Sequence, residues 1–149
     1  EYIEMRTTKK LGNCMFRTAE RLNYLIRKYG INNLGLFIMC CVMKDNNEYI
    51  KHTAIYNKKQ DKIIDCANGK IILVDKEYYI QQTFTNTKNN YYTITYLDEY
   101  NISLNINNKK IILNDNNIEK FNKDILEEFI MEIIKKNWIH MKEELEKEE

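Results

Sequence analysis

Cys14 combines a nucleophilic side chain with a place at the expected start of a helix. Asn13, directly before it, is a favourable N-cap because its amide oxygen can accept from the free N–H groups of the first turn. Apolar residues follow at helical spacing as far as Gly30, a residue type that commonly ends helices. Unpaired N–H groups and the helix dipole at such a start favour negative charge, which activates a thiol. We expect a helix from about Cys14 to Tyr29 that presents Cys14 as a nucleophile.

A histidine and an aspartate further along the chain complete a candidate catalytic set. His52 lies near the start of the β-rich run Tyr49–Tyr56, and Asp65 ends the next run, which begins at Lys62. Two such runs joined by a short polar break predict a hairpin, whose antiparallel pairing brings these ends together. If both side chains share a face, Asp65 accepts from one imidazole nitrogen while the other nitrogen faces the thiol. The sequence predicts a triad in which Cys14 attacks a carbonyl, His52 moves the proton and Asp65 orients the ring.

The order of these residues resembles that of papain-like cysteine hydrolases. Cys14 stands at a helix start, His52 opens a strand and Asp65 lies on the next strand. The region His52–Lys70 is similar to the His…Asp-Pro-x-x-Gly region of peptidases that remove double-glycine leaders. It also resembles the papain-fold domains of bacterial toxins and the transglutaminase-like enzymes. The resemblance, which covers about Gly12–Thr83, implies thiol-dependent chemistry on an amide of a protein or peptide substrate.

Three features depart from the pattern of these families. The leader peptidases usually have a longer segment between the cysteine and the histidine than the one from Cys14 to His52. Cys66 follows Asp65 where the leader peptidases have proline, and the glutamine that papain-like enzymes often place ahead of the cysteine is missing. An oxyanion hole would then need the N–H of Cys14 together with Asn13 or another donor. These departures favour a small, minimal version of the fold over any particular subfamily.

The rest of the pattern predicts one α+β domain over residues 1–149. The apolar run Leu36–Met43 is typical of a central strand covered on both faces. Tyr91–Leu97 predicts another strand, and Asn107-Asn108 predicts the turn of a hairpin. A helix with one buried stripe is expected over about Asn117–Glu146. We expect a papain-like arrangement, with the N-terminal helix that carries the cysteine packed on an antiparallel sheet of five to six strands and a long C-terminal helix.

Composition excludes several classes of partner from the prediction. The 23 Lys and Arg residues nearly balance the 22 Asp and Glu residues, so we expect neither nucleic acid nor a membrane as partner. No zinc pattern, phosphate loop or dinucleotide fingerprint is present, and we expect no metal and no cofactor. The four cysteines indicate a reducing compartment rather than a disulfide framework. We therefore expect a cytoplasmic protein, or one delivered into a target cell's cytosol if it belongs to a larger toxin.

Several functions are compatible with these residues. Peptidase, deamidase and transglutaminase reactions share the attack by Cys14, and a bacterial toxin, effector or phage-encoded domain is the expected setting. The alternative is a non-enzymatic protein-interaction module of a mobile element, in which Cys14 and His52 are structural. A third interpretation is an RNA-binding domain that uses the basic first helix, although no recognition motif accompanies it. A catalytic Cys14 is expected in a cleft, whereas burial under core side chains favours the module.

Overall fold

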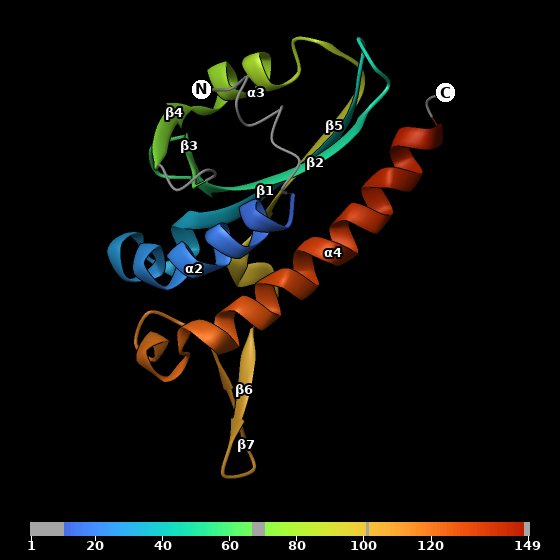
Figure 1. Ribbon diagram of the computed structural model, residues 1–149. Coiled ribbons are helices and arrows are strands. Elements are labelled where there is room, and N and C mark those ends of the chain that lie inside the picture. The colour runs from blue at the N-terminus through green and yellow to red at the C-terminus, as the bar shows by residue number, and fades with distance from the viewer. Residues whose placement is uncertain (1–10, 67–70, 101, 148–149) are drawn as a thin grey trace.

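The computed structural model describes residues 11–66, 71–100 and 102–147, and only the backbone of residues 11–13. Its helices and strands, in chain order, are α2 (Leu11–Tyr29), β1 (Leu34–Met43), β2 (Tyr49–Asn57), β3 (Lys62–Asp65), β4 (Ile72–Asp75), α3 (Lys76–Thr83), β5 (Thr87–Tyr96), β6 (Ser103–Ile106), β7 (Lys109–Ile112) and α4 (Lys123–Lys147). The predicted α+β class is confirmed: an N-terminal helix, a five-stranded antiparallel sheet and a C-terminal helix (Figure 1).

The sheet separates two apolar clusters. Its strand order is β4-β3-β2-β1-β5, with every neighbouring pair antiparallel. On one face, Ile38 and Cys40 of β1 pack with residues of α2 and α4; on the other, Phe37 and Cys41 pack with Tyr79 of α3. Figure 1 shows α2 and α4 on one side of the sheet and α3 on the other. The prediction of a central strand covered on both faces is confirmed.

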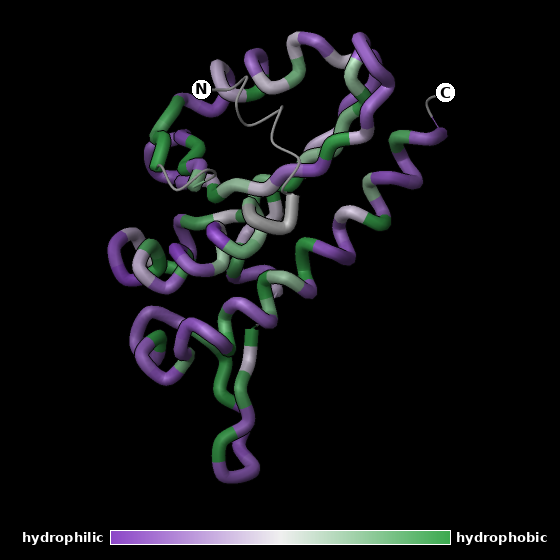
Figure 2. Tube along the Cα trace, in the orientation of Figure 1, coloured by the Kyte–Doolittle hydropathy of each residue, from purple (hydrophilic) through white to green (hydrophobic). Residues whose placement is uncertain are grey.

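The strands β6 and β7 form a separate hairpin, so the main sheet does not reach six strands. Asn107 and Asn108 occupy the turn with φ values of 51° and 64°, the positive values that a type I′ turn requires at both central residues. The hairpin projects away from the sheet, and its tip is hydrophilic (Figures 1 and 2). Its side chains are exposed or half-buried, and the paired residues Leu104 and Ile111 pack against the core cluster on the α2 side of the sheet.

Helix α2 begins earlier than expected. Its first described residue is Leu11, so Asn13 and Cys14 both lie within the helix. The prediction that Asn13 is the N-cap is therefore wrong, because an N-cap residue lies outside the helical backbone. The end of α2 is as predicted: Gly30 has φ +90°, and its N–H donates to the carbonyl of Ile26 at 2.8 Å.

The C-terminal helix begins later than expected. Instead of starting at Asn117, the chain forms a short 3₁₀ turn at Ile118–Lys120, and α4 starts at Lys123. The side chain of Asn122 accepts from the N–H of Ile125 at 3.0 Å, which is the hydrogen bond of a helix N-cap. This local capping bond, which the apolar periodicity does not reveal, sets the start of α4. Figure 2 shows the alternation of hydrophilic and hydrophobic residues along this helix.

Candidate active site

The β2–β3 hairpin places His52 and Asp65 on the same face of the sheet. Ile55 pairs with Ile64, so the register puts Asp65 across from Ala54, two residues from His52. Residues two apart on a strand point to the same face, and diagonal neighbours on adjacent strands are within reach of long side chains. The hairpin geometry alone therefore brings the imidazole to the carboxylate.

A local hydrogen-bond network holds this register. The side-chain oxygen of Asn57 accepts from the N–H groups of Lys59 and Gln60, at 3.1 and 3.4 Å. Asp61 then takes a positive φ of 55°, and its carboxylate accepts from the hydroxyl of Tyr56 at 2.6 Å. Asparagine and aspartate favour such turns because their short polar side chains bond to the backbone nearby. A one-residue slip of this turn would move the Asp65 side chain to the other face.

His52 and Asp65 form a buried pair. The imidazole Nε2 lies 2.7 Å from Oδ2 of Asp65, and the two side chains are 4% and 1% exposed. The hydroxyl of Tyr79 donates to the same Oδ2 at 2.5 Å. Tyr79 is completely buried on α3, where its ring meets Phe37 edge-on at 5.4 Å. The carboxylate therefore receives two hydrogen bonds away from water, the condition under which a buried charge is tolerated.

The surroundings of His52 favour its charged form. Burial of the ring lowers its pKa, but the negative charge of Asp65, the charge of Cys14 and hydrogen bonds to both oppose this effect. The result is a pKa for His52 well above the usual 6.5. An opposite charge within a few ångströms commonly outweighs desolvation in this way. The imidazolium is thus the favoured form of His52 at neutral pH.

Cys14 contributes the third side chain of the site. It influences the pKa of His52 through its charge and a hydrogen bond, so the thiol lies beside the ring. Because Nε2 faces Asp65, Nδ1 is the ring atom left for the thiol. Nδ1 is buried and makes no regular hydrogen bond within the described part of the chain. Such contacts are often long or poorly aligned in unliganded active sites and tighten when substrate binds.

The approach of Cys14 to His52 depends on the different lengths of the strands. His52 pairs with Met39 and points to the α3 side of the sheet, whereas α2 packs on the opposite side. Strand β3 pairs with β2 only from Ile55 onward, so the edge of β2 beside His52 has no neighbouring strand among the described residues. Cys14 is buried but belongs to neither apolar cluster.

One expectation about the site is not met, and another is not tested. Cys14 is 4% exposed and does not lie in an open cleft. The predicted oxyanion-hole role of Asn13 falls on a side chain outside the described residues. Tyr79 is a member of this network that the sequence did not indicate. Nothing in the sequence pairs it with Asp65, because the contact joins a short helix to a strand end through tertiary packing alone.

The other cysteines are in different surroundings. All four are free thiols. Burial and then the charge of Asp65 raise the pKa of Cys66 to about 11, although the nearby Arg21 and Arg17 lower it in part. Burial also raises the pKa of Cys40. A thiol that resists ionisation is a poor nucleophile, so Cys40 and Cys66 are poor candidates for the nucleophile.

The described residues hold no cluster of three or more side chains suited to a metal ion. Among the described helices, none has both the length and the apolar character needed to cross a membrane. Comparisons of the chain with family models, with curated proteins and with solved structures find no match.

Proposed function

We propose that this chain is a cysteine-dependent amide hydrolase or acyl transferase of papain-like type, with Cys14 as nucleophile. The observation that supports this proposal is the orientation of one imidazole: Nε2 of His52 is held by Asp65 at 2.7 Å, and Nδ1 is left for the thiol. This arrangement has the nucleophile, base and orienting acid that activate a thiol.

The residues divide the reaction between them. The sulfur of Cys14 attacks the carbonyl carbon of a protein or peptide amide. The His52 imidazolium gives its proton to the departing nitrogen as the C–N bond breaks, leaving a thioester. Neutral His52 then takes a proton from water for hydrolysis, or from an amine for transfer. Asp65 keeps the ring in place, and Tyr79 keeps Asp65 in place.

The burial of Cys14 adds a condition to this proposal. A thiol that is 4% exposed reacts with substrate only after the side chains that cover it have moved. Local opening of part of a protein costs less free energy than global unfolding. The proposal therefore includes an opening at the start of α2 that exposes Cys14 while the rest of the core stays packed.

Alkylation of the folded protein tests both the reactivity of the Cys14 thiol and the local opening that exposes it. Iodoacetamide is applied below the denaturation midpoint, and the modified cysteines are identified by peptide mass mapping. We expect Cys14 to react first and His52→Ala to remove its advantage. Cys40 and Cys66 are the internal controls, since burial raises the pKa of both. Global unfolding would expose Cys14, Cys40 and Cys66 equally. Alkylation of all three in equal proportion would therefore contradict the proposal.

The second candidate is the non-enzymatic interaction module, which the same burial favours. The side chains of Cys14, His52 and Asp65 are each no more than 4% exposed, as expected of a polar network that only stabilises a fold. In that case Cys14→Ser, which keeps a hydrogen-bonding group, should retain the binding function of the module. Turnover of a peptide ester or amide that is lost in Cys14→Ser identifies the enzyme instead.

A further inference from the structure

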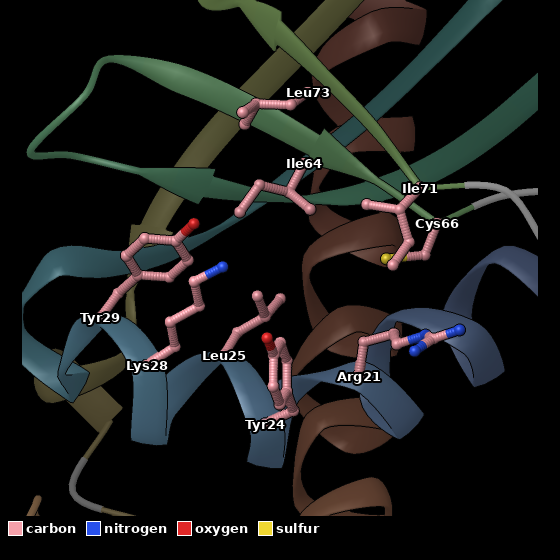
Figure 3. Close-up of a pocket in the computed structure, with 9 residues that line it drawn as sticks. All are labelled: Arg21, Tyr24, Leu25, Lys28, Tyr29, Ile64, Cys66, Ile71 and Leu73. Carbon is pink, nitrogen blue, oxygen red and sulfur yellow. The ribbon is translucent and has the colours of Figure 1, made fainter.

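A groove lies between α2 and the edge of the sheet formed by β3 and β4. Its volume is about 220 Å³, and Figure 3 shows side chains from both sides pointing into it. Ile64, Cys66 and Leu73 make the strand side apolar, whereas Arg21 and Lys28 of α2 are cationic. The groove is smaller than sites that enclose a whole small molecule, about 300 Å³ or more. This size suits individual side chains of a larger partner.

The cationic side chains of the groove lie on nearly the same face of α2 as Cys14. Arg21 and Lys28 follow Cys14 by two and four turns, about 10 and 21 Å along the helix axis, and lie on nearly the same face. Figure 3 shows the Arg21 side chain extending toward the N-terminal part of α2. Arg21 also acts electrostatically on Cys66, the neighbour of Asp65 in the chain. A partner in the groove would therefore run from the candidate active site toward the end of α2.

We propose that this groove binds an extended segment of the protein substrate that carries apolar and acidic side chains. This inference rests on the proposed function. An extended chain advances about 3.3 Å per residue, so the acidic side chains that meet Arg21 and Lys28 stand about three and about six residues from the bond that Cys14 attacks.

Charge complementarity is the reason for an acidic partner. The nine residues that line the groove include two cations and no carboxylate. Tyr24 and Tyr29, also in the lining, place their rings 5.8 and 5.3 Å from the ammonium of Lys28. The cation–π attraction to these rings holds the Lys28 ammonium at the groove. The exposed side chain of Leu73 opposite then supplies the contact for an apolar side chain.

A nucleic acid fits this groove less well than a peptide. Nucleic-acid sites combine a basic track with aromatic platforms and lose affinity steeply with salt. Here the strand side consists of aliphatic side chains and a thiol, namely Ile64, Cys66, Ile71 and Leu73. Aliphatic contacts match side chains of a polypeptide better than phosphates.

Binding measurements on the full chain with Cys14→Ala test the proposal without requiring catalysis. The probes are a fluorescein-labelled peptide with Glu and Leu at three-residue intervals, its Lys-for-Glu counterpart and a single-stranded RNA of similar length. We expect the Glu/Leu peptide to bind best and Arg21→Glu or Lys28→Glu to weaken it about fivefold each, the upper range for an exposed charge pair. The same two variants should strengthen binding of the Lys counterpart.

Arg27→Glu is the matched control. Arg27 is exposed on α2 and points away from the groove by the helical period, so its reversal should change the affinity less than twofold. The groove proposal would be overturned by equal binding of both peptides, by no peptide binding or by preferred binding of the RNA. It would also be overturned if Arg27→Glu and Arg21→Glu changed the peptide affinity equally. None of these outcomes alters the alkylation pattern of Cys14, so failure of the groove and failure of the catalytic site are distinguishable.

Discussion

Replacing Tyr79 by phenylalanine isolates the contact that the sequence did not reveal. The substitution removes one hydroxyl, which donates to Oδ2 of Asp65 at 2.5 Å. It keeps the ring, so the edge-on contact with Phe37 is preserved. Any loss of stability therefore comes from the hydrogen bond rather than from packing.

The structure sets the size of the expected loss. A hydrogen bond to a charged group contributes about 1.5–3 kcal/mol, more than one between neutral groups. Both partners are buried, with Tyr79 0% and Asp65 1% exposed, so water cannot replace the lost donor. Asp65 keeps its hydrogen bond to His52, which places the expected loss within that range rather than above it. With a urea slope of about 2 kcal/mol per molar, the midpoint should fall by about 1 M.

Urea unfolding of a double-mutant cycle is the assay. Tyr79→Phe, Asp65→Asn and the double variant are compared at constant slope, and the coupling energy should be at least about 0.5 kcal/mol. Tyr92→Phe is the control, because its ring stacks on the same Phe37 at 5.3 Å but the residue is 40% exposed. It should change stability by less than about 0.5 kcal/mol. Additive losses, or equal losses in Tyr79→Phe and Tyr92→Phe, would refute the reasoning.

Three other substitutions test the site. Asp65→Asn should lower turnover at least about a hundredfold, because an amide can hold the wrong imidazole tautomer. Asp61→Asn should be tolerated in the same peptide-hydrolysis assay, since asparagine also accepts the positive φ of 55° at that turn. Cys14→Ala should lower the free energy of unfolding in urea melts by about 1 kcal/mol or more, and Cys41→Ala should do the same, because both thiols are buried. A negligible loss for Cys14→Ala alone would mean that the site is open in solution. In the parent protein, the raised pKa of His52 should make the free energy of unfolding fall as pH rises from about 6.5 to 8. The folded state then keeps a proton that the unfolded chain loses, so the slope approaches about 1.4 kcal/mol per pH unit, and a flat profile would contradict it.

The local sequence pattern was enough to predict the elements that carry the site. The alternation and β-branching of residues near His52 and Asp65 predicted two paired strands, and the polar break between them predicted the hairpin. Gly30 marked the end of the first helix because a positive φ is easy for glycine. These features depend on residues a few positions apart, so the local pattern contains them. The helix starts were less well determined: Asn13 looked like a cap, yet the helix includes it.

The contacts among the side chains of the site depend on how distant segments pack together. Among the described residues, β2 has no neighbouring strand on the β3 side beside His52, and α3 brings Tyr79 to Asp65. The burial of Cys14 is likewise a sum of contacts from distant segments. Short-range propensity carries no information about such contacts, since each depends on how separate elements pack. The sequence therefore predicted which side chains to consider, whereas the packing decided which imidazole nitrogen faces the acid, which residue holds the acid and how far the thiol lies from solvent.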